Sequence, residues 1–398
     1  MTARFQVRAG AGASVEGAPP THDALEFHRR LPGYRTTPLL DRPVLAEALG
    51  VGQVLVKDEA SRLGLPAFKM LGASWASYCA VLERLGRDPG PWSTTEELAG
   101  RLASLRPMAL AAATDGNHGR AVARMATLLG FEASIFVPAG TAKVRIDAIE
   151  SEGASCTVVD GTYGDAVARS AAEASERCLI ISDTSWPGYE DVPRRVIEGY
   201  GTMFWEVDDE LAARGVPGPD LVVVQMGVGA LAAAVVRHYR RLSGPTGTRL
   251  LGVEPTRAAC VLASAEAGRI VTVPGPHDSI MAGLNCGTPS LVAWPLVSRG
   301  IDVFCAVDDD RARQGMRTLA RAGIVAGETG AAGLGGLVEV LSNPAAEAAR
   351  AALGLGLATR VLLLCTEGAT DPAAYAKIVG VAPDAVTVAD EQEESRSP

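Results

Sequence analysis

The stretch KDEASRLGLPAFKMLGA, residues 57–73, decides the fold of this chain of 398 residues. Its last lysine, Lys69, follows a turn and opens an apolar, alanine-rich pattern that predicts a helix over residues 68–85. An amino group at such a place can form a Schiff base with a carbonyl group. Most lysines are solvated surface charges, so the alternative is an ordinary surface lysine in the first turn of a helix.

Length, charge and hydropathy limit the possible functions. A chain of 398 residues has room for two domains or for one large α/β unit. Its formal net charge of −9 argues against a nucleic-acid partner, because a polyanion requires a basic protein face. The strongest apolar run, residues 361–365, has the length of a strand, and residues 1–8 lack the apolar segment of a signal peptide. We therefore expect a cytoplasmic protein without a membrane partner.

The spacing of cysteines and histidines does not predict a metal centre. The seven cysteines include no CxxC pair, and the five histidines lack the spacing of metal ligands. The cysteines of a cytoplasmic protein are expected to be thiols. The chain also lacks a GxSxG motif, so a Ser-His-Asp hydrolase site is not supported.

Short apolar, β-branched runs alternate with alanine-rich stretches along the chain. This alternation predicts an α/β fold in which helices cover parallel or mostly parallel sheets. Residues 1–22, rich in glycine, alanine and proline, are expected to be loose until something docks them, and the acidic segment 384–398 is expected to be a loose end. The expected strands are residues 54–56, 110–113, 134–137, 156–159, 179–181, 221–224, 250–253, 303–306 and 361–364, and the expected helices include residues 68–85, 119–129, 143–151 and 163–175.

The motif ATDGNHG, residues 113–119, lies between a predicted strand and a predicted helix. The free N–H groups at the start of such a helix can bind an anion, for example a substrate carboxylate. Asn117 can donate a hydrogen bond to a phenolic oxygen, and Asp115 can accept a proton. The alternative is a structural turn in which Asp115 caps the helix.

The motif QMGVGAL, residues 225–231, also lies between a predicted strand and a predicted helix. Small residues let a phosphate approach the backbone, and the helix dipole favours its charge. No lysine follows the glycines and the full GxGxxG pattern is missing, so a nucleotide-binding loop is not indicated. The alternative is a strand-to-helix turn that uses glycine only for its shape.

Two later turns contain further candidates. CTEGATD, residues 365–371, follows the strongest apolar run, and its Thr366 offers a hydroxyl to a ring nitrogen; the alternative is an ordinary turn with a helix N-cap. GETGAAGLGG, residues 327–336, is either another place where the backbone approaches a ligand or a site of tight helix packing.

In their order along the chain, these motifs resemble the pyridoxal-phosphate (PLP) enzymes of fold type II, the tryptophan-synthase-β-like fold, and above all the diaminopropionate ammonia-lyase family. The resemblance runs from YRTTPL at residues 34–39 to Asp371 and includes DTSWPGYED at 183–191 and AGLNCG at 282–287. It implies a PLP site in the cleft between two domains. Residues 1–69 and 183–398 would form a discontinuous large PLP-binding domain, and residues 70–182 the small domain. Enzymes of this fold are commonly homodimers, so a homodimer is expected.

The resemblance also implies how PLP is held. Lys69 would carry it as a Schiff base, Asn117 would contact its phenolic oxygen, and Thr366 would face its ring nitrogen. The phosphate would bind the backbone of Gly227, Val228, Gly229 and Ala230.

Two aspartates indicate the reaction. Dehydratases of this fold usually carry serine where this chain has Asp115, and Asp183 opens the DTSWPGYED segment. In the ammonia-lyase family such a pair serves opposite faces of the substrate, which implies that Asp115 deprotonates D-2,3-diaminopropionate and Asp183 the L-isomer. The implied reaction is α,β-elimination of the D-isomer, the L-isomer or both to pyruvate and ammonia.

Other functions stay open at this point. One is a PLP-dependent dehydratase or β-replacement enzyme that acts on a serine- or threonine-like amino acid, against which Asp115 argues. Another is a non-catalytic homologue that binds a small molecule, against which Lys69 argues. Cys260 and Cys286 lie where the family can carry a cysteine pair, and two thiols are expected in a reducing compartment.

Overall fold

The computed structural model describes residues 3–8, 19–241 and 247–387. Its strands are β1 (Arg4–Val7), β2 (Leu39–Asp41), β3 (Gln53–Asp58), β4 (Ala109–Ala113), β5 (Glu132–Pro138), β6 (Ser155–Val159), β7 (Cys178–Ile180), β8 (Leu221–Gln225), β9 (Arg249–Pro255), β10 (Val303–Val307) and β11 (Arg360–Cys365). Its α-helices are α1 (Asp23–His28), α2 (Pro43–Leu49), α3 (Lys69–Leu85), α4 (Thr95–Arg101), α5 (Asn117–Leu129), α6 (Lys143–Glu150), α7 (Tyr163–Ala171), α8 (Asp191–Arg214), α9 (Ala230–Tyr239), α10 (Cys260–Ala267), α11 (Trp294–Gly300), α12 (Asp309–Arg321), α13 (Ala332–Ser342), α14 (Glu347–Leu353) and α15 (Pro372–Val379).

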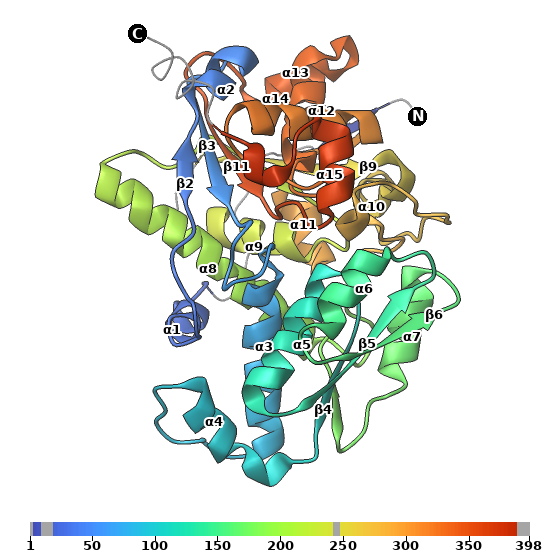
Figure 1. Cartoon of the computed structure of the whole chain (residues 1–398). Coiled ribbons are helices and arrows are strands. Elements are labelled where there is room, and N and C mark those ends of the chain that lie inside the picture. Colours follow the sequence, from blue (N-terminus) through green and yellow to red (C-terminus); the bar gives the residue numbers. More distant parts are fainter. Residues whose placement is uncertain (1–2, 9–18, 242–246, 388–398) are drawn as a thin grey trace.

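The strands form two sheets (Figure 1). The larger has the order β1-β10-β9-β8-β11-β3-β2, and the smaller β6-β5-β4-β7. In the larger sheet the five inner strands are parallel, while β1 and β2 pair antiparallel at its edges. All neighbours in the smaller sheet are parallel. The predicted α/β fold with mostly parallel sheets is confirmed.

Both faces of the larger sheet are buried, which explains its uninterrupted apolar runs. In β11, Leu362 and Leu364 pack into the core that includes α3, α8 and α9, whereas Val361 and Leu363 pack on the side of α12 and α13. The first of these cores continues to Ile135 of the smaller sheet. One hydrophobic core therefore joins the two sheets.

A buried charge cluster, formed by Lys57, Glu59, Arg62 and Glu206, ties the opening stretch to α8. The Lys57 ammonium lies 2.7 Å from Glu206 Oε2, and Arg62 donates to both Glu59 and Glu206 at 2.7 Å. The four side chains are between 0% and 2% exposed, so each charge depends on its partners. The turn that leads to Lys69 is thereby anchored to α8.

Helices α3 and α8 approach each other through glycine. A Cβ on Gly199 of α8 would lie 2.4 Å from the carbonyl oxygen of Leu71 in α3, a distance that no side chain tolerates. Because α3 begins at Lys69, this contact sets the position of that lysine. Helix α8 is absent from the predicted elements, since Gly199 and Gly201 weaken its helical pattern in the sequence.

Residues 1–22 are expected to be loose until something docks them, and the structure shows Arg4–Val7 docked as β1 on the edge of the larger sheet, a strand that the sequence did not predict. Four residues are too few for an alternating pattern to stand out in a sequence. Asp23–His28 then forms α1, and residues 9–18 lie outside the described residues. Of the predicted loose end at 384–398, residues 388–398 also lie outside them, and Pro383–Ala385 forms a short 3-10 helix.

The carboxyl ends of strands from both sheets point to one region. Strands β3, β8 and β11 of the larger sheet and β4 and β7 of the smaller sheet are followed by the motifs singled out in the sequence. Parallel sheets bind ligands at such ends. The predicted domain boundaries agree with the division of strands between the sheets and stay a prediction.

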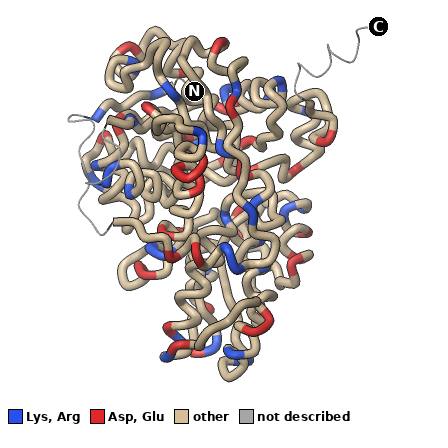
Figure 2. Tube along the Cα trace, turned by 90° about the vertical axis from the view of Figure 1, so that its left-hand side faces the viewer, with Lys and Arg blue, Asp and Glu red and all other residues tan. Residues whose placement is uncertain are grey.

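Charged residues are distributed over the whole described trace (Figure 2). Lys and Arg alternate with Asp and Glu along both parts of the molecule rather than collecting in one stripe. Among the helices that the structure describes, none is long and apolar enough to cross a membrane.

Candidate active site

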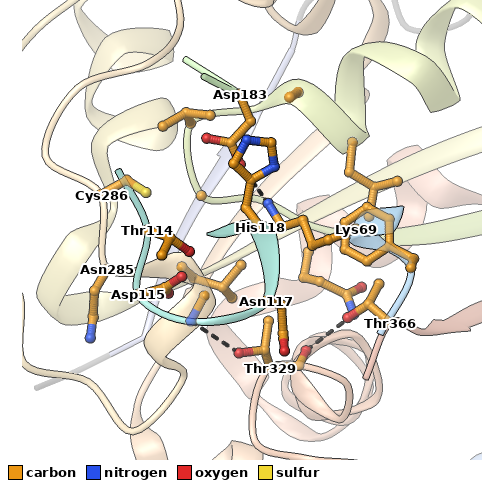
Figure 3. A pocket seen from close by; sticks show the side chains of 18 of the residues that line it. Lys69, Thr114, Asp115, Asn117, His118, Asp183, Asn285, Cys286, Thr329 and Thr366 are labelled. Carbon is orange, nitrogen blue, oxygen red and sulfur yellow. Dashed lines mark hydrogen bonds and ion pairs between the residues drawn. The ribbon is translucent and has the colours of Figure 1, made fainter. Parts of the chain in front are cut away.

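All the predicted site residues line one cavity (Figure 3). They lie in the segments that follow five strands, β3, β4, β7, β8 and β11, so the fold brings together parts of the chain that are far apart in the sequence. The residues are Lys69, Asp115, Asn117, Asp183, Gly227, Val228, Gly229, Ala230 and Thr366. Their individual roles stay predictions.

Lys69 and Asp183 form an ion pair inside this cavity. Lys69 Nζ donates to Asp183 Oδ2 at 2.6 Å, and the Tyr163 hydroxyl donates to Oδ1 of the same carboxylate at 3.1 Å. Burial disfavours both charges, but their attraction outweighs it: the pKa of Lys69 is raised and the pKa of Asp183 is held well below its usual range. A proton donor, the Lys69 ammonium, and a proton acceptor, the Asp183 carboxylate, therefore lie side by side.

Asp115 is a buried carboxyl that does not cap a helix. Helix α5 begins at Asn117 with Gly116 as its N-cap and without a side-chain cap, which excludes the capping alternative. Burial raises the pKa of Asp115, while the charges of Arg145 and Lys69 oppose that rise. The stem of Arg145 lies over Gly116, whose Cβ would be 3.3 Å from Arg145 Cδ. A raised pKa makes Asp115 a stronger base than an ordinary carboxylate.

Thr366 is oriented by a buried amide at the end of β8. Gln225 Nε2 donates to Thr366 Oγ1 at 2.8 Å and to the Leu364 carbonyl at 2.9 Å. Because Thr366 Oγ1 accepts this bond, its own proton remains available to the cavity. The N-cap in this motif is Asp371, which accepts from the N–H of Ala374 and starts α15. The capping alternative thus applies to Asp371 and not to Thr366.

Asn117 is held by a glutamate from the far end of the chain. Its Nδ2 donates to Glu367 Oε2 at 2.5 Å, and Glu367 Oε1 accepts from the Thr329 backbone N–H at 3.1 Å. Glu367 is only 4% exposed. The amide group of Asn117 therefore has a defined orientation at the edge of the cavity.

The glycine turn before α9 forms a backbone cradle. Gly229 has a φ of +93°, and a Cβ on Gly227 would lie 3.1 Å from the Gly283 carbonyl oxygen and 3.2 Å from Cys286 Sγ. Helix α9 has no side-chain cap, so the N–H groups of its first turn face the cavity end of the helix without partners inside the helix. Such a turn suits a phosphate.

The second glycine-rich turn is chiefly a packing site. A Cβ on Gly327 would lie 2.5 Å from the Gly368 carbonyl oxygen, and one on Gly330 would lie 2.4 Å from that of Glu367. The packing interpretation therefore holds for these glycines, although Thr329 between them lines the cavity.

Two described residues of the cavity lining carry a buried polar atom that lacks a hydrogen-bond partner. Among the described residues, His118 Nδ1 and Gln225 Oε1 are buried without a hydrogen-bond partner, and both residues line the cavity. Cys260 and Cys286 are free thiols. In the described part of the chain no group of three or more His, Cys, Asp or Glu side chains could hold a metal ion.

Sequence reasoning missed four residues that shape this site: Tyr163, Arg145, Gln225 and Glu367. Gln225 gave a usable signal, since it is the polar end of the apolar strand LVVVQ. Glu367 lies in a recognised motif but had no predicted partner. Nothing in the sequence connects Tyr163 with Asp183 or the charge of Arg145 with Asp115, because both relationships depend on how α6 and α7 pack.

Comparison with known proteins identifies the family. The model of the family described as "Pyridoxal-phosphate dependent enzyme" matches residues 30–367. The chain is 35% identical to the diaminopropionate ammonia-lyase of Salmonella typhimurium over 95% of its length and 96% of that protein, and 38% identical to the Escherichia coli K12 enzyme over 89% and 90%. The chain belongs to the diaminopropionate ammonia-lyase family of PLP-dependent enzymes. The resemblance inferred from the motifs is confirmed.

A solved structure supports this assignment. The structure of Escherichia coli diaminopropionate ammonia-lyase "in complex with aminoacrylate-PLP azomethine reaction intermediate" matches with a TM-score of 0.84 at 35% identity, covering 95% of this chain and 97% of that chain. Membership in the family confirms that the chain is a PLP-dependent enzyme. The diaminopropionate ammonia-lyase fold of this chain also fits the cofactor, because the glycine cradle and Thr366 both border the cavity that contains Lys69.

Proposed function

We propose that this enzyme catalyses α,β-elimination of 2,3-diaminopropionate, in the D-form, the L-form or both, to pyruvate and two molecules of ammonia. The observation that carries the proposal is the placement of two separate carboxylates, Asp115 and Asp183, in one cavity with Lys69. The names of the relatives at 35% and 38% identity agree with it.

The charge of the cavity suits a substrate with two amino groups. Asp115, Asp183 and Glu367 line it, and Lys69 is the one Lys or Arg side chain among the described residues that do. A hydroxy amino acid has one amino group fewer to offer these carboxylates. The charge balance therefore favours a diamino acid over serine or threonine.

The residues that line the cavity would each contact a different part of PLP. Lys69 would hold PLP, the cradle at Gly227–Ala230 its phosphate, Asn117 its phenolic oxygen and Thr366 its ring nitrogen. The bound cofactor supplies an electron sink for the pair of electrons left at Cα. A neutral hydroxyl at the ring nitrogen leaves that nitrogen largely unprotonated, which suits elimination over transamination.

Three side chains, Asp115, Asp183 and Lys69, would transfer protons. Asp115 would remove the Cα proton of the D-isomer, and Asp183 that of the L-isomer, from opposite faces of the substrate. Lys69 would protonate the departing 3-amino group. The released 2-aminoacrylate takes up water and yields pyruvate and the second ammonia, so that one substrate and one water give one pyruvate and two ammonia molecules.

The first experiment measures 2-oxo acid release by PLP-loaded enzyme: pyruvate from D- and L-2,3-diaminopropionate and from D- and L-serine, and 2-oxobutyrate from L-threonine. Fast release from either diaminopropionate isomer and slow release from the hydroxy acids support the proposal. Faster release from serine or threonine would replace it with the dehydratase alternative. Lys69→Ala serves as the control and should lose both turnover and the visible absorbance of bound PLP; protein that never binds PLP would favour the non-catalytic alternative.

We also propose that the enzyme works as a homodimer in the cytoplasm. The dimer is supported by the fold, because enzymes of this fold are commonly homodimers. The location is supported by the small amino-acid substrate that the site suits. Sedimentation equilibrium of the PLP-loaded protein gives the oligomeric state directly, and fractionation of the source cells gives the location.

A further inference from the structure

We propose that Glu367 is a positioning residue that fixes the amide of Asn117, so that Asn117 presents an N–H to the phenolic oxygen of PLP. This inference rests on the PLP site described above and on the proposed contact of Asn117, and not on the identity of the substrate.

The side chain of Glu367 bridges two parts of the site. Its Oε2 accepts from Asn117 Nδ2, on the helix that follows β4 of the smaller sheet, and its Oε1 accepts from the Thr329 N–H on the side of the larger sheet. Gly327 leaves room for this carboxylate, since a Cβ at that position would lie 3.1 Å from Glu367 Oε1. One buried group therefore connects the two walls of the cavity.

The carboxylate determines which end of the Asn117 amide faces it. Burial raises the pKa of Glu367, and the charge of Arg145 opposes that rise. When Glu367 is ionised it only accepts hydrogen bonds, so the NH₂ group and not the carbonyl of Asn117 then points toward it. An NH₂ group has two hydrogens, and one is used by Glu367. The other is then available to the anionic phenolic oxygen, which needs a donor.

The backbone of Glu367 also meets the segment that leads into Lys69. Glu367 forms an antiparallel bridge with Ala67, the Gly368 N–H donates to the Pro66 carbonyl at 2.9 Å, and the Phe68 N–H donates to the Thr366 carbonyl at 3.1 Å. Glu367 thus sets the position of Asn117 relative to the lysine that would carry PLP.

The glutamine variant tests this role with little change in size. In Glu367→Gln, one arm of the side chain becomes an NH₂ donor. If its oxygen keeps the Thr329 N–H, its NH₂ group faces Asn117 and favours the flipped amide, with the carbonyl toward residue 367. We expect PLP affinity to fall about ten- to a hundredfold, the usual effect of losing a hydrogen bond to a charged group.

The experiment is a double-mutant cycle read by PLP binding. Dissociation constants and the pH dependence of the visible absorbance of bound PLP are measured for wild type, Glu367→Gln, Asn117→Ala and the double variant. Glu339→Gln is the matched control: Glu339 is also buried and holds an asparagine amide, with Asn343 Nδ2 at 2.6 Å from its Oε1, but it does not line the cavity.

The proposal predicts similar losses of PLP affinity in the two single variants and no further loss in the double variant. Glu339→Gln should bind PLP like the wild type while losing some thermal stability. Wild-type affinity in Glu367→Gln, or losses that multiply in the double variant, would overturn the proposal. Because PLP binding is measured without substrate, a wrong assignment of the substrate leaves these outcomes unchanged and is detected separately by pyruvate release.

Discussion

Lys69 and Asp183, 114 positions apart in the chain, meet with 2.6 Å between the ammonium nitrogen and the carboxylate oxygen Oδ2. The pair places a proton donor next to a proton acceptor, and Tyr163 keeps the carboxylate from rotating by donating to its second oxygen. Asp115 shares the cavity without such a partner, and burial raises its pKa. The two aspartates are therefore electrostatically different, which is the basis for different roles.

The first prediction separates the two aspartates by the handedness of the substrate. Asp115→Asn should lower kcat/KM for the D-isomer about 10²- to 10⁴-fold, the usual contribution of a general base, and affect the L-isomer less. Asp183→Asn should show the reverse preference. Pyruvate release from each pure enantiomer measures both. Equal losses on the two isomers would mean that the aspartate supports the site generally.

The second prediction concerns pH. Burial raises the pKa of Asp115 and Arg145 opposes that rise, so Arg145→Met should raise the pKa further. A base is inactive when protonated, and the acid limb of the D-isomer rate profile should therefore move to higher pH. Arg145→Lys should keep the wild-type profile. Lys143→Met, an exposed cation two positions earlier in α6, is the control and should leave the profile in place.

The third prediction concerns the contact between α3 and α8. Gly199→Ala places a methyl group 2.4 Å from the Leu71 carbonyl oxygen and should cost about 1–3 kcal/mol of unfolding free energy. Gly201→Ala, in the same helix, meets no atom within 4 Å and should stabilise the protein by up to about 1 kcal/mol through helix propensity. Urea unfolding of both variants checks the pair. Similar stability of the two variants would contradict the steric explanation.

The fourth prediction concerns the buried charge cluster. Glu206→Gln removes one of the two carboxylates that neutralise Lys57 and Arg62 in the buried cluster. This loss should cost about 3–5 kcal/mol of unfolding free energy. Glu210→Gln, which removes an exposed pair with Arg214 on the same helix, should cost about 0–1 kcal/mol. Denaturant unfolding at neutral pH compares them, and a small loss in Glu206→Gln would show that the cluster is dispensable.

The same cluster has a defined pH dependence. Burial alone would raise the pKa of Glu206, but Arg62 and Lys57 lower it from 4.5 to about 2. A lowered carboxyl pKa means that the folded state binds its proton less readily than the unfolded state. The stabilisation by Glu206 is therefore complete at neutral pH and is lost as the pH falls from 4.5 toward 2.

The fold and the lining of the site could be predicted from the sequence because local sequence patterns indicate both. Apolar runs such as LVVVQ and the motifs directly after them mark strands and strand ends without reference to the rest of the chain. The order of motifs then places the strand ends at one cavity through a known fold. Lys69, Asp115 and Asp183 could all be named in this way.

The groups that tune the site could not be named, because their contacts join distant segments. Nothing in the sequence distinguishes Lys57 and Arg62 from ordinary surface charges. Both are buried in the structure, where Glu206 of α8 pairs with them. Two glycines weakened the helical pattern of α8 in the sequence, and packing against α3 requires one of them, Gly199. Glu367 likewise acquires a role only through Asn117, 250 positions away. Long-range charge pairing and close helix packing leave no periodic signature in a sequence.

Strand β11 lies between β8 and β3 in the middle of the larger sheet, although it is the last strand in the sequence. A chain emerging from the ribosome therefore holds two incomplete pieces, β8 to β10 on one side and β2 with β3 on the other, until nearly all of it has been made. The same late segment places Thr366 and Glu367 in the lining of the cavity. A fragment that ends before residue 360 therefore lacks both the strand that joins the two pieces and these two lining residues.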